Sequence, residues 1–202
     1  MYRQLAAFPN ILTLLRLAII PFIVINLVGG NYRWALGLLV LAGLTDFLDG
    51  NLARALKQRT QLGQYLDPIA DKMLLSTLFL VLSIVHKIPW KYTVLVFSRD
   101  VSILVVAGLL FITTTLRNFK PSIFGKINTA AQIAAVFFVL LYQVTPVAWV
   151  AMARRISLYA TLVFTIVSGL HYIWVIAQRL RAHNAGGAAL NDAPRSFPIA
   201  GR

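Results

Sequence analysis

Residues 33–54 read RWALGLLVLAGLTDFLDGNLAR, an apolar run that closes on two aspartates and an arginine. Every residue between Arg33 and Thr45 is apolar or glycine, as in a helix that crosses a bilayer. Asp46 and Asp49 stand three positions apart, so a helix carries both carboxylates on one face. The stretch therefore predicts a membrane-spanning helix whose last turns present acidic side chains at one surface.

Six such segments follow one another along the chain, and we place them at 10–29, 33–54, 67–86, 91–115, 126–146 and 149–179. Only 12% of the 202 residues are charged, whereas a typical soluble domain has about 25%. Helices are the expected spanning elements, because a lone strand leaves backbone groups unpaired in lipid. We expect an all-α membrane protein, a six-transmembrane-helix bundle over residues 1–182. The Gly-, Ala- and Asn-rich stretch 183–202 is expected to be a disordered cytoplasmic tail.

The lysines and arginines indicate how this bundle is oriented. With both termini in the cytoplasm (N-in/C-in), twelve of the basic residues lie inside and five lie outside, namely Arg33, Lys87, Lys91, Arg154 and Arg155. The positive-inside rule describes this asymmetry. The net charge of +13 is thus spread over loops that face anionic lipid, and it forms no stripe for nucleic acid. The chain has no cysteine, which excludes disulfides and thiolate metal sites.

The side-chain carboxylates of the chain are six aspartates, and four of them fall between positions 46 and 71. Asp67 and Asp71, four positions apart, again share one helical face. Carboxylates gathered at membrane depth are costly and tend to mark function. Divalent cations relieve their mutual repulsion, because oxygen ligands suit Mg²⁺ or Mn²⁺ and can hold two ions for phosphoryl chemistry. We therefore expect Asp46, Asp49, Asp67 and Asp71 to form a two-metal site.

Single residues of this group also have plainer explanations. An aspartate before a proline is typical of a helix N-cap, and an Asp-Gly pair is typical of a turn. No such explanation accounts for four aspartates in one region of an acid-poor chain. The individual alternatives are an N-cap at Asp67-Pro68, a turn at Asp49-Gly50, and an ion pair of Asp46 with Arg54 or Arg16.

The string that contains these aspartates resembles the signature of the CDP-alcohol phosphatidyltransferase family, D-x2-D-G-x2-A-R-x8-G-x3-D-x3-D. The resemblance implies a six-helix membrane bundle that forms a homodimer, in a bacterial cytoplasmic membrane with the active site on the cytoplasmic side. It also implies an enzyme that moves a phosphatidyl group from CDP-diacylglycerol to an alcohol and releases CMP. All fixed positions of the signature are present, at Asp46, Asp49, Gly50, Ala53, Arg54, Gly63, Asp67 and Asp71.

The resemblance also implies a role for each aspartate. Asp46, Asp49 and Asp67 would bind one divalent ion, and Asp46, Asp67 and Asp71 would approach a second. Asp71 would be the catalytic general base on the acceptor hydroxyl. Nearby ions would lower its pKa and keep it ionised at neutral pH.

Small residues beside the aspartates indicate where the nucleotide binds. Gly50, Ala53 and Gly63 add almost no side chain, so a nucleotide or phosphate can approach the backbone. The resemblance implies that these three residues line the cytidine pocket, with Arg54 near the diphosphate. The expected CDP site therefore adjoins the expected metal site.

The acceptor alcohol is less constrained by the sequence. Residues 9–16, PNILTLLR, look like the first helix of phosphatidylglycerophosphate synthases and of cardiolipin synthases in this family. Arg99-Asp100 and the Lys-x-Asn-Thr at 126–129 are nearer to eukaryotic-type cardiolipin synthases, whose acceptor is phosphatidylglycerol. We expect glycerol-3-phosphate as acceptor, with phosphatidylglycerol as the alternative. The candidate ligands of an acceptor phosphate are Arg117, Lys120 and Lys126.

Other interpretations of the charged residues stay open at this point. The three basic residues also fit the positive-inside bias alone, and Arg99-Asp100 also fits a buried ion pair. A membrane prenyltransferase is disfavoured, because its two aspartate motifs usually lie far apart, whereas 17 residues separate Asp49 and Asp67. A small transporter or proton relay would spread its acids along several helices, whereas here they gather at one end.

Overall fold

The computed structural model describes residues 8–55, 61–113 and 123–191, with side chains chiefly over 13–46, 69–103 and 125–171. Within these ranges the chain is helical apart from short turns, so the all-α prediction is confirmed there. Each helix corresponds to one predicted apolar segment. The helices are α2 (Phe8–Val28), α3 (Tyr32–Ala55), α4 (Gln61–Ile84), α5 (Trp90–Thr113), α6 (Ile123–Val144) and α7 (Ala148–Asn191).

Two helices extend beyond the predicted segments. α4 begins at Gln61, well before the expected start at 67. Asp67 therefore lies inside the helix, and its interpretation as an N-cap is wrong. α7 continues to Asn191, into the stretch expected to be a tail, where alanines and a leucine favour a helix. The division into a domain at 1–182 and a tail at 183–202 stays a prediction, and residues 192–202 lie outside the described part.

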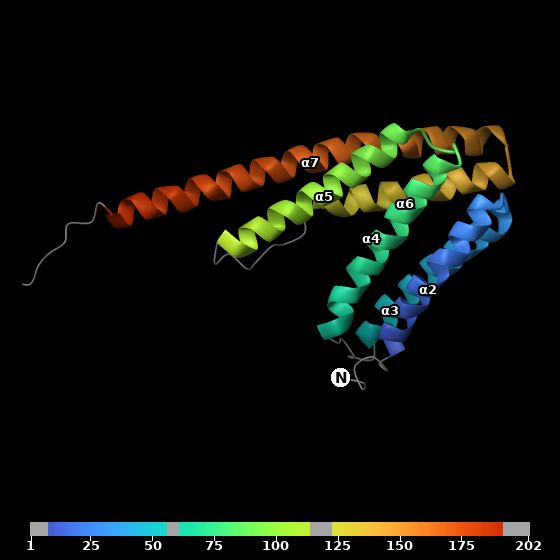
Figure 1. Cartoon of the computed structure of the whole chain (residues 1–202), viewed down its shortest axis with the longest axis horizontal. Helices are drawn as coiled ribbons and strands as arrows, with labels where there is room; N and C mark the ends of the chain where they lie inside the picture. The colour runs from blue at the N-terminus through green and yellow to red at the C-terminus, as the bar shows by residue number, and fades with distance from the viewer. Residues whose placement is uncertain (1–7, 56–60, 114–122, 192–202) are drawn as a thin grey trace, which may run out of the picture.

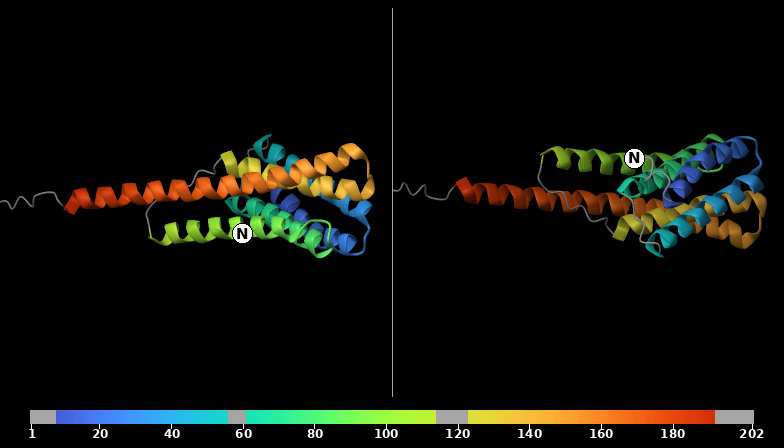
Figure 2. Two further views of the ribbon diagram at one scale, coloured as in Figure 1. Left: turned by 90° about the horizontal axis from the view of Figure 1, so that it is seen from above. Right: turned by 90° about the horizontal axis from the view of Figure 1, so that it is seen from below.

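The helices form two groups that meet along a shared interface (Figures 1 and 2). α2 packs against α3 and α4, α7 packs against α5 and α6, and α6 contacts both α3 and α4. The interface is aliphatic and aromatic, with Ile23, Leu78, Phe79 and Val136 fully buried. Figure 1 shows the start of α2, the end of α3 and the start of α4 together at one end of the molecule. This arrangement brings the acidic ends of α3 and α4 to one place.

Two tight turns reverse the chain at the opposite ends of these helices. Gly30 closes α2 with a φ of 74°, a left-handed conformation that glycine adopts without strain. His86, which also has a positive φ of 56°, follows the end of α4, and the Lys87 N–H donates to the Leu82 carbonyl at 2.8 Å. The short connections hold α3 beside α2 and bring α5 back onto α4.

Much of the outer surface is apolar. Large side chains that are more than half exposed include Phe22, Trp34 and Trp149. In the part of the chain whose residues are described, two helical segments are long and apolar enough to cross a membrane, Gly125–Val144 and Ala148–His171. The part of α2 whose side chains are described, Thr13–Val28, is apolar but shorter. Six spans and the N-in/C-in orientation therefore stay predictions.

Candidate active site

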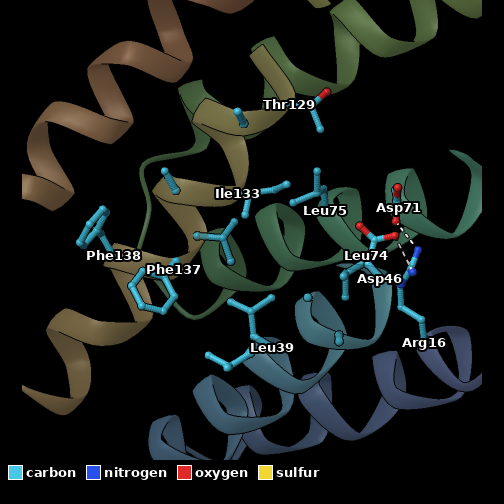
Figure 3. A pocket seen from close by; sticks show the side chains of 16 residues that line it. Arg16, Leu39, Asp46, Asp71, Leu74, Leu75, Thr129, Ile133, Phe137 and Phe138 are labelled. Atoms are coloured by element: carbon cyan, nitrogen blue, oxygen red, sulfur yellow. Dashed lines mark hydrogen bonds and ion pairs between the residues drawn. The ribbon is translucent and has the colours of Figure 1, made fainter. Parts of the chain in front are cut away.

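Three charged side chains from three helices meet at one end of the bundle (Figure 3). Arg16 of α2 contacts Asp46 Oδ1 of α3 through Nη2 at 2.6 Å, and Asp71 Oδ1 of α4 through Nη1 at 2.5 Å. The arginine side chain is 1% exposed, whereas the Asp46 and Asp71 side chains are 50% and 43% exposed. The fold thus brings together two of the four predicted aspartates, and Asp46 contacts Arg16, one of its two predicted partners; the side chain of the other, Arg54, lies outside the described part.

An apolar cavity of about 490 Å³ opens beside these three side chains. Arg16, Asp46 and Asp71 form its charged end, and Figure 3 shows both carboxylates turned toward the guanidinium. The rest of the wall comes from α3, α4 and α6. A cavity with charge at one end and hydrocarbon along its length suits a ligand with a charged head and an apolar chain. The labelled apolar residues of the wall are Leu39, Leu74, Leu75, Ile133, Phe137 and Phe138.

The Asp46 and Asp71 pair fits part of a divalent-cation site. Two unit charges about 4 Å apart interact by about 4 kcal/mol at the effective dielectric constant of a protein surface. Two carboxylates that share one guanidinium keep a net negative charge, and their oxygens are ligands that Mg²⁺ and Mn²⁺ accept. Among the side chains that the structure describes, no third Asp, Glu, His or Cys completes the set.

Most of the other predicted site residues have described backbones only. They occupy the last turns of α3 and the first turns of α4, on the same two helices as Asp46 and Asp71. Helical periodicity places Asp49 one turn from Asp46, and Asp67 one turn from Asp71. A single site built from all four aspartates stays a prediction. The residues whose side chains lie outside the described part are Asp49, Gly50, Ala53, Arg54, Gly63 and Asp67, and Arg117 and Lys120 lie wholly outside it.

A second charged cluster joins α4, α5 and α7. Arg99 donates through Nη1 to Asp100 Oδ1 at 2.7 Å and through Nη2 to Ser168 Oγ at 2.8 Å. Lys72 Nζ lies 2.9 Å from the same Asp100 oxygen. The Arg99 and Asp100 side chains are only 10% and 15% exposed. These contacts agree with the interpretation of Arg99-Asp100 as a buried ion pair, and they tie three helices together.

α6 carries two residues on which the acceptor prediction depends. Lys126 is exposed. Asn128 is fully buried, and its Oδ1 accepts a hydrogen bond from Thr165 Oγ1 of α7 at 2.9 Å. Its neighbour Thr129 lines the cavity. Asn128 therefore faces α7, and its side chain is not part of the described cavity wall.

The apolar wall of the cavity was not predicted from the sequence. α6 is apolar over most of its faces, so its pattern does not show which face meets α3 and α4. A weak signal is present in Ala130 and Ala134, which are one turn apart and both line the cavity. Gly43 of α3 contributes to the same space, and no atom lies within 4 Å of the place where its Cβ would stand.

Comparison with known proteins gives one family match. The model of the family described as CDP-alcohol phosphatidyltransferase matches residues 6–167. This range covers α2 to α6 and most of the apolar part of α7, so it includes all three residues at the charged end of the cavity.

Several curated proteins are similar to the chain over most of its length. A Homo sapiens protein named "Cardiolipin synthase (CMP-forming)" is 34% identical over 154 residues, 67% of this chain and 50% of the human one. A Bacillus subtilis protein named "CDP-diacylglycerol--glycerol-3-phosphate 3-phosphatidyltransferase" is 33% identical over 193 residues, 87% of this chain and 98% of the relative. A Mycobacterium tuberculosis protein named "Probable phosphatidylglycerophosphate synthase" is 31% identical over 179 residues, 84% and 81% of the two chains. The chain thus spans about half the length of the human relative.

Proposed function

Because the chain belongs to the CDP-alcohol phosphatidyltransferase family, we propose that it transfers a phosphatidyl group from CDP-diacylglycerol to an alcohol and releases CMP. The observation that carries this proposal is the meeting of Asp46 and Asp71 at the charged end of an apolar cavity. Divalent ions held by the two carboxylates would attract the phosphate groups of a lipid nucleotide to the charged end, and the hydrocarbon wall suits an acyl chain.

The proposed reaction is a displacement at phosphorus. The acceptor hydroxyl oxygen bonds to the phosphorus of the phosphatidyl group, and the bond from that phosphorus to the oxygen of CMP breaks. CMP leaves with the electron pair of that bond. Asp71, whose side chain is half-exposed at the edge of the cavity, takes the proton of the hydroxyl. A positioned general base contributes about 10²–10⁴-fold to such a rate.

We also propose that Asp46, Asp49, Asp67 and Asp71 hold two divalent ions, Mg²⁺ or Mn²⁺. Such ions, when bound, neutralise phosphate charge and orient the reacting groups. The support is the oxygen-donor chemistry of Asp46 and Asp71 and their net negative charge beside Arg16. The residues proposed to bind the CDP group are Gly50, Ala53 and Gly63 at the cytidine and Arg54 at the diphosphate.

The proposed setting is a membrane that all six helices cross, with both termini in the cytoplasm. The exposed apolar side chains of the bundle, among them Phe22, Trp34 and Trp149, support this setting, because such a surface is unfavourable in water. The active site would then face the cytoplasm at the surface of a bacterial cytoplasmic membrane. A homodimer is proposed on the family resemblance.

Glycerol-3-phosphate is the acceptor that we propose, with phosphatidylglycerophosphate as the product. The Bacillus subtilis relative that matches over nearly its whole length is named for this acceptor, and the exposed Lys126 is available to bind the acceptor phosphate together with Arg117 and Lys120. The second candidate acceptor is phosphatidylglycerol, favoured by the human relative named as a cardiolipin synthase.

An acceptor panel tests this proposal. The purified protein would be incubated with radiolabelled CDP-diacylglycerol and Mg²⁺, with either glycerol-3-phosphate or phosphatidylglycerol, and the CMP and lipid products measured. We expect metal-dependent CMP release and phosphatidylglycerophosphate with the first acceptor. If a lipid product forms only with phosphatidylglycerol, and that product is cardiolipin, then phosphatidylglycerol and not glycerol-3-phosphate is the acceptor. No CMP release with any alcohol would refute the proposed reaction, and a transporter or proton relay would give that result.

A further inference from the structure

Arg16 is the largest fully buried side chain in the described part of the bundle. It extends from α2 to one carboxylate on α3 and to another on α4 (Figure 3). The two contacts use different terminal nitrogens, Nη2 for Asp46 and Nη1 for Asp71. One planar guanidinium therefore fixes where these two carboxylates stand relative to each other.

The exposures of the three side chains separate their roles. Arg16 is 1% exposed, whereas about half of each carboxylate remains exposed at the charged end of the cavity. A ligand in the cavity therefore meets the carboxylates more fully than it meets the arginine. The guanidinium of Arg16 lies between two carboxylates that otherwise repel each other.

We propose that Arg16 is a positioning residue, which holds Asp46 and Asp71 at their working separation before any metal ion binds. This inference rests on the proposed function, in which both aspartates are metal ligands. The ligands come from separate helices, so their separation depends on a contact that reaches both. Ions then enter a site that is already formed, and the protein does not have to bring the two carboxylates together against their repulsion.

A purely structural role for Arg16 makes a different prediction. A buried arginine is destabilising unless carboxylates compensate its charge. If that is the only role of the two contacts, replacing Arg16 changes the stability of the protein and does not change its affinity for metal ions. Arg16→Lys separates the two roles. Lysine keeps the positive charge but has one nitrogen and no planar fork, so it cannot hold two carboxylates in the same way. Because Arg16→Lys does not change the net charge of the site, a change in ion affinity cannot be explained by a change in net charge.

Mn²⁺ binding to the detergent-solubilised, chelator-treated protein tests the proposal without turnover, because the electron paramagnetic resonance signal of free Mn²⁺ reports the unbound ion. Removing a group that orients metal ligands typically weakens metal affinity by about 10–100-fold, and we expect a loss in this range for Arg16→Lys. The matched control is Arg33→Lys, at an exposed arginine near the start of α3, which should bind Mn²⁺ like the wild type. Equal Mn²⁺ affinities of the wild type and Arg16→Lys would overturn the positioning role of Arg16 and would leave the proposed metal site standing. A wild type that binds no Mn²⁺ would overturn the proposed metal site, and the inference with it.

A distance measurement in the protein with Arg16 intact keeps the test decisive if Arg16→Lys does not fold. The chain has no cysteine, so Leu44→Cys on α3 and Met73→Cys on α4, at side chains 54% and 52% exposed, take one spin label each. We expect the same distance distribution with and without Mg²⁺, and a broader one for Arg16→Lys without Mg²⁺. A distribution that narrows or shifts when Mg²⁺ is added to the protein with Arg16 intact would show that the ions set the separation, and the proposal would be wrong.

Discussion

Replacing Asp100 by asparagine should destabilise the bundle far more than replacing its exposed partner Lys72. The Asp100 Oδ1 atom accepts from Arg99 at 2.7 Å and lies 2.9 Å from Lys72 Nζ. Asp100→Asn keeps the shape of the side chain and removes its charge. Arg99, which is 10% exposed, then loses its ionic partner and keeps the hydrogen bond to the hydroxyl of Ser168 on α7.

The burial of each partner sets the expected magnitude. Removing one member of a buried ion pair costs about 3–5 kcal/mol, because the other charge stays buried without compensation. The Ser168 hydrogen bond persists, and the new amide oxygen can still accept from Arg99, so we expect the lower end, about 3 kcal/mol. Lys72 is 44% exposed, and an ion pair this accessible to water contributes about 0–1 kcal/mol.

Thermal unfolding followed by circular dichroism in detergent measures the difference. For a chain of this size each kcal/mol shifts the melting temperature by about 2–4 °C, so Asp100→Asn should lower it by about 6–12 °C and Lys72→Met by a few degrees at most. The double variant Arg99→Met, Asp100→Leu removes both buried charges and should recover most of the loss. A loss for Asp100→Asn no larger than that for Lys72→Met would refute the ion-pair reasoning. So would an unchanged melting temperature combined with a raised KM for the acceptor.

The remaining predictions concern the acceptor and the lipid. If Lys126 and Arg117 bind an acceptor phosphate, Lys126→Ala and Arg117→Ala should raise the KM for glycerol-3-phosphate severalfold more than the KM for CDP-diacylglycerol, which steady-state kinetics would show; equal changes in the two constants would point to a structural role. Gly43→Leu should raise the KM for long-chain CDP-diacylglycerol, because Gly43 lines the cavity and has open space beside it. Gly37→Leu is its matched control, since Gly37 lies on the same helix, has equally open space and is not part of the cavity wall; similar kinetics of the two variants would argue against an acyl chain in the cavity.

The helices in the described part of the chain were largely predictable, because a long apolar run in a membrane protein forms a helix. The charged and turn-forming residues between the runs set most boundaries to within a few residues. The start of α4 was missed because Asp67-Pro68 is a strong N-terminal signal, yet the helix begins at Gln61. The end of α7 was missed because glycines and two prolines near the C-terminus indicate disorder, while the alanines between them favour a helix.

The sequence predicted that Asp46 and Asp71 lie near each other, but it did not predict the side chains that surround them. The spacing of the aspartates placed Asp46 and Asp71 on the facing ends of two successive helices, where the structure has them. Arg16 lies 30 positions before Asp46 in the sequence, and only the packing of α2 against both α3 and α4 decides that it contacts the two carboxylates together. The cavity wall from α6 depends on tertiary contacts in the same way, because the sequence of a helix that is apolar on most faces does not show which face packs against its neighbours.

The most direct test of the account is the rate of CMP release from CDP-diacylglycerol by Asp71→Asn. Arg16 keeps its ion pair with Asp46 at 2.6 Å, and the Asp71 side chain is 43% exposed, so the variant should keep the melting temperature of the wild type within a few degrees. An amide cannot take up the hydroxyl proton, so we predict that turnover falls by about 10²–10⁴-fold or more. A folded Asp71→Asn protein that releases CMP at the rate of the wild type would contradict the account.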